Sequence, residues 1–378
     1  MPRVVIAAGG TAGHVVPALA VADALRGKGA EVSFLGARGR LEAELVPAAG
    51  YEIDFLRVRG LDRRAPLKAA SAAALATAAV PAARRALRRR QAEVVMGGGG
   101  YVAGPAGLAA VSARLPLVLT ESDRHLGLAN RLLARRARRV CLAFPIPGRD
   151  EARYVVTGRP VPAAILAADR EGARRRFGVS PEDRCLLVFG GSLGARSINL
   201  CALDAFVGDG VAASRRDYHV IQITGHRDYP LARQRLNTAG GVERYTLLEY
   251  EPTLADPLAA CDLVLARAGG SVFELAAAGR PAILVPYPHA TAHHQDANAA
   301  WMSEAGAALV IDDSQLVPGT LLRTVTDLFA DPSRLERMSA ASGALARPDA
   351  AVRVAEQVLA AAAPRAAGGE RVVTSTEP

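Results

Sequence analysis

Short apolar runs rich in β-branched residues alternate along the chain with longer stretches rich in alanine and leucine. This alternation is typical of strands spaced by helices, and it predicts βαβ units with parallel sheets. In the first half we expect strands at 4–8, 31–35, 53–58, 94–96, 117–120, 140–144 and 154–157, with helices such as 17–28 and 41–49 between them. In the second half we expect strands at 185–189, 219–224, 246–250, 263–266, 282–286 and 308–311, then helices at 318–329, 333–345 and 349–362.

The pattern restarts after the proline-containing stretch 158–162, which we interpret as a hinge because proline continues neither a helix nor a strand. We therefore expect an N-terminal domain over 1–160, completed by the helix at 349–362, and a C-terminal domain over 163–346. The remaining segment, 364–378, is expected to be a disordered tail.

A faint internal repeat supports two similar domains. Segments 4–14 and 186–195 both contain an apolar strand followed by Gly-Gly, then Thr or Ser, one further residue and another glycine. The predicted fold class is α/β, with two doubly wound Rossmann-like domains facing a central cleft. Ligands of such sheets bind beyond the carboxyl ends of the strands.

Composition narrows the class of protein. The 378 residues are 50% hydrophobic and 22% charged, which is enough for two cores and excludes a disordered polyelectrolyte. The four cysteines form no CxxC pair and lie mostly in apolar runs, so we expect neither a disulfide framework nor a zinc site, and a reducing compartment. We expect no signal peptide, because a strand-like run at 3–8 starts at once and ends in a glycine pair. We expect no membrane span, since the alanine-rich stretch 69–83 is short and broken by Pro81.

The net charge of +9 is concentrated in one segment, 57–90, which has ten basic residues and a single acid, Asp62. Such clustering favours an anionic partner surface, for which lipid head groups, pyrophosphates and nucleic acid are candidates; a solvated helix face is the alternative. Few aromatic residues lie among the basic ones, so nucleic acid is not the expected partner. The basic residues are Arg57, Arg59, Arg63, Arg64, Lys68, Arg84, Arg85, Arg88, Arg89 and Arg90, with a second cluster at Arg131, Arg135, Arg136, Arg138 and Arg139.

Glycine-rich turns follow three predicted strands, at 9–13, 190–194 and 269–271. None matches the dinucleotide or P-loop pattern, and no D-x-D pair is present to hold a metal. Free backbone N–H groups at a helix N-terminus, with the hydroxyls of Thr11 and Ser192, suit a phosphate without metal or cofactor. The alternative is an ordinary tight turn.

Two ionisable residues stand next to these turns. Glu274 lies one helical turn after the third, where a carboxylate can accept two vicinal ribose hydroxyls; its spacing from Ser271 also fits a capping box, and both interpretations stay open. His14 directly follows the first turn, whereas its repeat counterpart is Ala195. A neutral imidazole there suits a general base, although it could simply bond the chain at the helix start.

Other polar side chains stand at expected strand ends. Tyr101 projects from a run of glycines, and Glu121 and Asp123 follow another strand. A further cluster is typical of sugar recognition rather than zinc binding, since its spacing lacks the H-E-x-x-H pattern. That cluster contains His289, His293, His294, Gln295 and Asn298.

These features together resemble the MurG family of glycosyltransferases, which belong to family 28 and have the GT-B fold. The resemblance runs from about residue 4 to 362 and is most specific at 9–17 and 99–105. It implies an inverting transfer of N-acetylglucosamine (GlcNAc) from UDP-GlcNAc to the N-acetylmuramyl 4-hydroxyl of lipid I, the undecaprenyl-diphosphate-linked MurNAc-pentapeptide, which gives lipid II. The alternatives are a transferase for another acceptor, a UDP-GlcNAc 2-epimerase of the same fold, or a two-domain sugar-binding protein.

The resemblance also implies residue roles. His14 and Glu121 fall at positions tied to catalysis, Glu274 would hold the ribose, and Gln295 the GlcNAc hydroxyls. Ser192 and the turn at 269–271 would hold the donor diphosphate, and the N-terminal glycine loops would face the acceptor diphosphate. Arg159 is expected to replace a nucleotide-facing arginine that the family has at the hinge. The family is peripheral on the cytoplasmic face of the cell membrane, so the basic stretch would face anionic lipids. The full set of implied substrate-binding residues is Thr11, Ala12, Gly13, Tyr101, Asp123, Asn130, Arg159, Ser192, Gly269, Gly270, Ser271, Glu274, His294 and Gln295.

Overall fold

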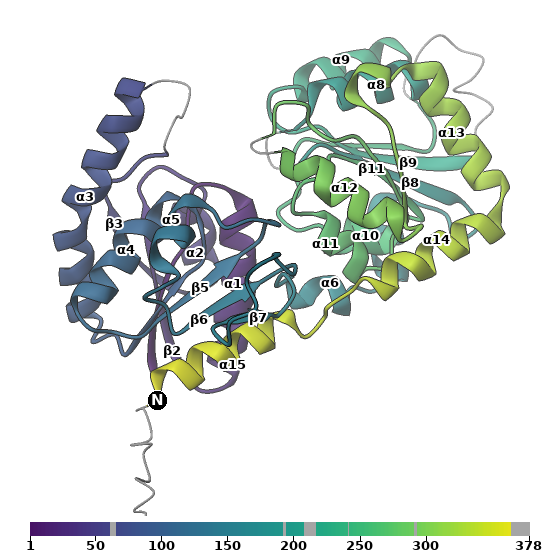
Figure 1. Ribbon diagram of the computed structural model, residues 1–378. Helices are drawn as coiled ribbons and strands as arrows, with labels where there is room; N and C mark the ends of the chain where they lie inside the picture. The colour runs from purple at the N-terminus through teal and green to yellow at the C-terminus, as the bar shows by residue number, and fades with distance from the viewer. Residues whose placement is uncertain (61–65, 192–193, 208–216, 241, 291–292, 364–378) are drawn as a thin grey trace, which may run out of the picture.

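The computed structural model in Figure 1 describes residues 1–60, 66–191, 194–207, 217–240, 242–290 and 293–363, without the side chains of 66–70. In this part of the chain the strands form two separate parallel sheets, which confirms the predicted α/β class. Ser192, the basic residues Arg63 and Arg64, the side chain of Lys68 and the tail 364–378 lie outside the described residues.

The first sheet has seven parallel strands in the order β3-β2-β1-β4-β5-β6-β7. Its central strand β1 pairs with β2 and β4, and Val4 to Ala7 are buried because helices cover both faces. The strands are β1 (Arg3–Ala7), β2 (Glu31–Ala37), β3 (Glu52–Leu56), β4 (Val94–Gly97), β5 (Leu117–Glu121), β6 (Arg139–Leu142) and β7 (Tyr154–Val156).

Helices α3, α4 and α5 pack on one face of this sheet, and α1, α2 and α15 on the other. We call the sheet with these helices the N-lobe. The alanine-rich stretch is not broken at Pro81: α3 is one helix through that residue. The helices are α1 (Ala12–Gly27), α2 (Glu42–Ala48), α3 (Pro66–Arg89), α4 (Gly100–Ser112), α5 (Leu128–Leu133) and α15 (Ala350–Ala362).

The second sheet has six parallel strands in the order β10-β9-β8-β11-β12-β13, and with its helices we call it the C-lobe. Its strands are β8 (Arg184–Phe189), β9 (Tyr218–Ile223), β10 (Tyr245–Leu248), β11 (Leu263–Ala266), β12 (Ala282–Leu284) and β13 (Ala308–Val310). Its helices are α6 (Ala163–Ala167), α7 (Arg170–Phe177), α8 (Arg196–Phe206), α9 (Tyr229–Thr238), α10 (Ala255–Ala260), α11 (Val272–Ala277), α12 (His294–Glu304), α13 (Pro318–Ala330) and α14 (Pro332–Ala344), with a short 3-10 turn η3 (Asp313–Gln315).

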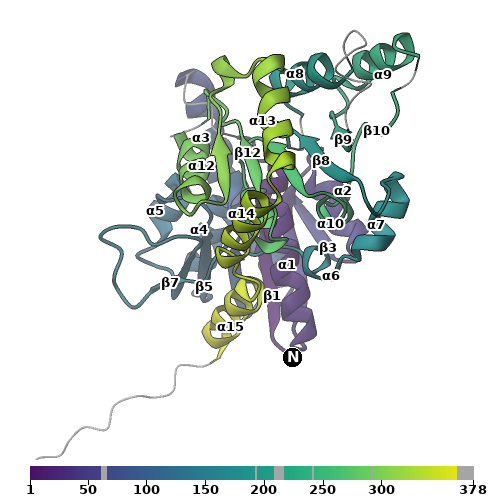
Figure 2. The ribbon, with the colours of Figure 1, turned by 90° about the vertical axis from the view of Figure 1, so that its right-hand side faces the viewer.

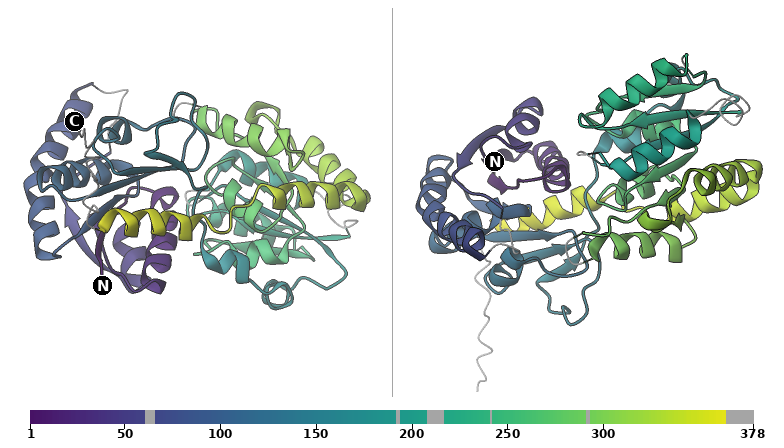
Figure 3. Two further views of the ribbon diagram at one scale, coloured as in Figure 1. Left: turned by 60° about the horizontal axis from the view of Figure 1, so that its bottom comes forward. Right: turned by 90° about the horizontal axis from the view of Figure 1, so that it is seen from above.

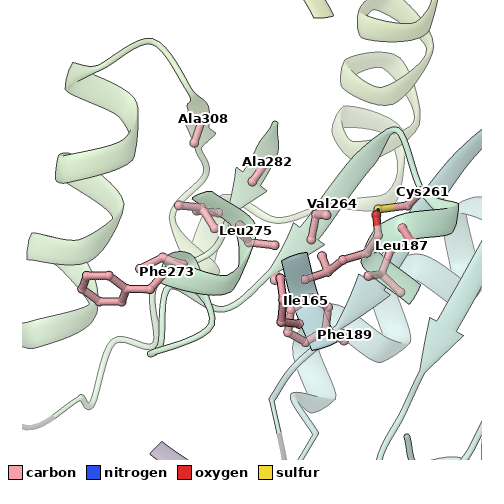
Figure 4. Close-up of a cluster of buried hydrophobic side chains, with 14 of the residues drawn as sticks. Ile165, Leu187, Phe189, Cys261, Val264, Phe273, Leu275, Ala282 and Ala308 are labelled. Carbon is pink, nitrogen blue, oxygen red and sulfur yellow. The ribbon is translucent and has the colours of Figure 1, made fainter. Parts of the chain in front are cut away.

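The C-lobe core lies on both faces of its sheet. Figure 4 shows one face, where Leu187 and Val264 pack near Ile165 of α6, while the ring of Phe273 points away from them at the edge of the group. Cys185 and Cys261 belong to this core, and all four cysteines are free thiols in buried positions. They act there as small apolar side chains.

The last two helices connect the lobes a second time. Figures 2 and 3 show α14 along the C-lobe and α15 continuing to the N-lobe. There Val354 and Val358 join the core beside α1, and Lys28 pairs with Glu356 at 3.1 Å.

The two sheets share one strand order around their first strand, so each has an equivalent switch point, between β1 and β4 and between β8 and β11. Loops that leave the carboxyl ends of these strands diverge there and leave room for a ligand. The first glycine turn and the Tyr101 loop flank one switch point; the second and third turns flank the other.

Candidate active site

The first glycine turn, after β1, interlocks with the glycine run after β4. A Cβ on Gly100 would overlap the carbonyl oxygen of Gly9, and a Cβ on Gly99 would overlap the ring of His14. Gly10 has a φ of +101°, and a Cβ there would lie 2.8 Å from the Tyr101 ring. Glycine is therefore required at these positions by close approach as well as by backbone conformation.

A residue that the sequence analysis missed supports the first turn from behind. Glu42, at the start of α2, is fully buried; its carboxylate accepts the N–H of Gly10 at 3.0 Å and that of Ala37 at 3.1 Å. A Cβ on Gly9 would overlap this carboxylate. The N–H of Gly10 is thus engaged and not available to a phosphate. In the sequence, Glu42 is explained by its place in the first turn of a helix, where an acidic side chain stabilises the helix, so nothing indicates its role in the glycine turn.

His14 lies half-buried on the first turn of α1, and its Nδ1 is 3.3 Å from the Thr11 hydroxyl. Burial, followed by the charge of Arg159, lowers the pKa of His14 from 6.5 to about 4, although Asp123 and Glu42 act in the opposite direction. The imidazole is therefore neutral at physiological pH. Ala12 and Gly13 separate it from Thr11, which is exposed.

Arg159 joins the turns of the two lobes. Its guanidinium donates to the carbonyl of Gly13 at 2.6 Å and lies over the ring of Phe273, 5.4 Å from the centroid. A Cβ on Gly270 would overlap the same guanidinium. Burial lowers the pKa of Arg159, and Glu274 and Asp123 oppose that effect. A buried cation thus stands at the third glycine turn, where a diphosphate was expected.

Glu274 lies one turn into α11, half-buried, and its carboxylate has no hydrogen-bond partner within the described parts of the chain. Burial raises its pKa from 4.5 to about 7, against the opposing charge of Arg159. Ser271, the N-cap residue of α11, forms no side-chain capping hydrogen bond, so the capping box is absent. Among the described residues, neither oxygen of the Glu274 carboxylate is occupied by a protein donor.

Two amides of α12 hold the third turn and the loop after β12. Asn298 donates to the carbonyl of Ala268 at 3.0 Å. Gln295 accepts the N–H of Tyr287 at 2.8 Å, which leaves its amide nitrogen near Gly269. His294 is half-buried at the start of the helix.

The second turn is held by a buried amide. A Cβ on Gly194 would overlap the carbonyl oxygen of Thr224, and Asn199, fully buried on α8, donates to that oxygen at 2.8 Å and to Asp228 at 2.9 Å. This arrangement fixes the described flank of the turn in which Ser192 was predicted to bind phosphate.

Glu121 is buried, and protein donors occupy its carboxylate. One oxygen accepts the backbone N–H groups of Ser122 and Asp123, at 3.0 and 3.2 Å. The other accepts the backbone N–H of Gly127 at 2.7 Å and the side-chain amide of Asn130 at 2.9 Å. Burial raises its pKa, and these hydrogen bonds oppose the rise. Such a carboxylate organises the loop at 121–127 and presents Asp123 toward His14 and Arg159.

The structure therefore brings His14, Asp123, Arg159 and Glu274 together between the lobes. The nearby histidines do not form a metal centre: His293 pairs with Asp296 at 3.0 Å, and in the described residues no three His, Cys, Asp or Glu side chains are grouped to hold a metal.

Comparison with known proteins supports one family over nearly the whole chain. Residues 4–142 match the glycosyltransferase family 28 N-terminal domain, and residues 185–354 match the glycosyltransferase family 28 C-terminal domain.

Two full-length relatives have the same name, UDP-N-acetylglucosamine--N-acetylmuramyl-(pentapeptide) pyrophosphoryl-undecaprenol N-acetylglucosamine transferase. The one from Moorella thermoacetica is 41% identical, covering 94% of this chain and 98% of the relative. The one from Methylococcus capsulatus is 43% identical, with the same coverage of both chains. Among solved structures, MurG of Acinetobacter baumannii is 29% identical with a TM-score of 0.71, and the match covers 95% of this chain and all of that one.

Proposed function

The chain belongs to the MurG family of family 28 glycosyltransferases, and we propose that its site transfers N-acetylglucosamine from UDP-GlcNAc to the N-acetylmuramyl 4-hydroxyl of lipid I. The chain is an N-acetylglucosaminyltransferase of peptidoglycan synthesis, and its product is lipid II. The observation that carries the proposal is a buried cation, Arg159, that lies between a neutral imidazole in one lobe and, in the other, a carboxylate without a hydrogen-bond partner among the described residues.

The donor lies on the C-lobe. Glu274 accepts hydrogen bonds from the two ribose hydroxyls, because a carboxylate that no described protein donor occupies can bind both hydroxyls of a vicinal diol. The diphosphate lies against the turn at 269–271, where Arg159 and the N-terminus of α11 offset its charge. The amide of Gln295, held at its oxygen by Tyr287, directs its nitrogen to the GlcNAc hydroxyls. No metal is needed for these contacts.

The acceptor approaches from the N-lobe. Its 4-hydroxyl attacks the anomeric carbon as the bond from that carbon to the UDP oxygen breaks, which inverts the configuration to a β1→4 link. His14 takes the hydroxyl proton. In the free protein, the charge of Arg159 lowers the proton affinity of the His14 imidazole. The diphosphate of the bound donor offsets that charge, so the proton affinity of His14 rises when the donor binds. Glu121 acts as a positioning residue for Asp123 and the loop around it.

The function is tested by incubating the purified chain with UDP-GlcNAc and a lipid I analogue in the presence of a metal chelator. We expect UDP and the disaccharide product in equal amounts. Failure to form the disaccharide would contradict the proposal. A reaction with the donor alone serves as the control, since an epimerase acts without an acceptor.

We also propose that the N-lobe docks on the cytoplasmic face of the cell membrane through α3, α4 and α5. These helices pack side by side and expose Leu75, Leu108, Leu128 and Leu132, the last two beside the exposed Arg131. Apolar side chains with nearby cations suit an anionic bilayer surface. No helix in the described part of the chain is both long and apolar enough to span a bilayer.

The basic segment contributes less charge to this surface than its composition indicates. Arg89 pairs with Asp54 at 2.7 Å, and Arg90 pairs with Asp54 and Glu52 of β3. Arg85 and Arg88 are exposed on the same helix. Sedimentation with vesicles containing anionic lipid tests the docking: Leu132→Ser should weaken binding, and Leu166→Ser, an exposed leucine of the C-lobe, is the matched control. Equal binding of both variants would exclude this surface.

A further inference from the structure

One aromatic side chain of the N-lobe lies inside the core of the C-lobe. Phe144 follows β6 and is 5% exposed, yet it belongs to the cluster that contains Phe273 and Ile165. The backbone before it is held in the N-lobe, since Ala143 donates its N–H to the carbonyl of Glu121 at 2.9 Å. Phe144 therefore ties the end of β5, where the loop of Glu121 begins, to the C-lobe.

Phe144 contacts two aromatic rings of the C-lobe. Its centroid lies 5.1 Å from that of Phe273 on α11 and 5.4 Å from that of Trp301 on α12, the latter nearly edge-on at 82°. Phe273 and Trp301 are themselves 5.0 Å apart. The three rings form a closed set, which constrains orientation more than a single contact does.

Two arginines of the N-lobe side extend this set toward the reacting groups. Arg124, in the loop that Glu121 organises, lies 5.1 Å from the Phe144 centroid, and Arg159 lies over Phe273. Phe273 immediately precedes Glu274 in α11. The acceptor-side loop and the donor-side helix are thus connected through one pair of rings.

We propose that Phe144 is a positioning residue for the transfer reaction, and that it sets the alignment of α11 with the loop at 121–127 by its contact with Phe273 and Trp301. The proposal rests on the function proposed above. The ring contacts of Phe144 are with Phe273, Trp301 and Arg124, so it acts on the distance between donor and acceptor and not on donor affinity. A small misalignment of reacting groups lowers turnover steeply.

The test replaces Phe144 with alanine and measures kcat, the dissociation constant of UDP by calorimetry, and tryptophan emission. We expect kcat to fall roughly ten- to a hundredfold, with UDP affinity nearly unchanged. Trp301 is the only tryptophan of the chain, so loss of the Phe144 ring should shift the whole tryptophan emission to the red. Phe144→Leu, which keeps most of the buried volume, should recover part of kcat.

Phe34→Ala is the matched control, since Phe34 is a fully buried phenylalanine of the N-lobe core on β2. Both alanine variants should lose stability, and only Phe144→Ala should lose kcat per folded molecule. If the alanine variants do not fold, Phe144→Leu and Phe34→Leu are compared in the same way. Turnover equal to that of the Phe34 control, or UDP affinity lost in step with kcat, would overturn the proposal. Absence of product from the unaltered chain contradicts the proposed function instead.

Discussion

The first and third glycine turns occupy similar places in the two sheets but have different charged groups packed against them. Each follows a strand at a switch point and opens a helix. Behind the first turn stands a buried carboxylate, Glu42, which takes the N–H of Gly10. Against the third stands a buried guanidinium, Arg159, which would overlap a Cβ on Gly270. Arg159 also donates to the carbonyl of Gly13 in the first turn, so the two turns differ by the carboxylate of Glu42. A glycine turn therefore does not define an anion site by itself; the set of charged side chains around it does.

The carboxylate of Glu42 also bears on the acceptor site that the sequence implied for the N-lobe. The resemblance implied that its glycine loops face the acceptor diphosphate, and this stays a prediction; the N–H of Gly10 would not contribute, because it donates to Glu42. In the proposed function the donor diphosphate lies against the third turn, while the first turn positions Thr11 and His14.

Removing the positive charge of Arg159 from between the two turns should have the largest effect on activity. Arg159→Ala is expected to lower kcat/KM roughly a hundred- to a thousandfold, because it removes a positioned donor at the leaving diphosphate. Arg159→Lys should recover only part of the activity, since lysine keeps the charge but not the fork that reaches Gly13. Steady-state kinetics measures both. Arg233→Ala, an exposed arginine on α9, is the control; equal kinetics of the Arg159 and Arg233 alanine variants would refute the role.

The second-largest effect is expected on UDP binding, when the negative charge of Glu274, the proposed ribose-binding residue, is removed. Glu274→Gln should weaken UDP binding about tenfold or more above pH 7, because a charged hydrogen bond is lost. In the unaltered chain the affinity should itself decline as pH falls through about 7, where the carboxylate takes up a proton. Calorimetry at several pH values measures this. A UDP analogue that lacks the ribose 2′-hydroxyl is the control: the two losses should not be additive, and full additivity would place Glu274 away from the ribose.

Removing the charge behind the first turn should have a smaller effect. Glu42→Gln keeps the volume but presents an NH2 group to one of the two N–H donors, so the turn should loosen and kcat fall roughly tenfold. UDP affinity should not change, since the donor lies on the other lobe. Glu44→Gln, an exposed acid on the same helix, is the control. A loss of UDP affinity in Glu42→Gln would mean that the two turns are not separate in function.

The smallest expected effect is on stability. The pKa of Glu274 is raised in the folded chain, so its ionisation opposes folding, and this cost appears as pH rises from about 4.5 through about 7. Glu274→Gln should therefore raise the melting temperature at pH 8 and leave it nearly unchanged at pH 4. Thermal denaturation at both pH values measures the difference. An equal shift at the two values would show that packing, and not charge, is responsible.

The fold could be predicted from the sequence because its signals are local. β-Branched runs and Gly-Gly turns locate strands such as β1 and β8 to within a residue or two. Pro81 was misinterpreted, because a helix held by its neighbours tolerates a proline that local rules place at its end. The predicted domain limits and the roles of the site residues stay predictions.

The site was harder to predict because its decisive contacts are not local. Nothing near Glu42 in sequence indicates that it supports Gly10, and nothing near Phe144 indicates that its ring enters the other lobe. Glu121 was expected at the chemistry from the family resemblance, and this stays a prediction; the structure adds that four N–H donors occupy its carboxylate. Patterns locate turns, and only the folded chain shows which charges surround them.

The close contact at Gly158 limits how the lobes can move. The chain passes between the lobes after β7 and again before α15, and the two passages touch: a Cβ on Gly158 would lie 2.7 Å from the Cβ of Arg347 and 3.3 Å from that of Ala350. Two connections at one point act as a pivot, so swinging of the lobes about it is permitted, whereas sliding or pulling apart would stretch both backbones. Opening for substrate exchange is thereby reduced to an angular motion with its smallest displacement at Arg159 and its largest at the far rims of the lobes.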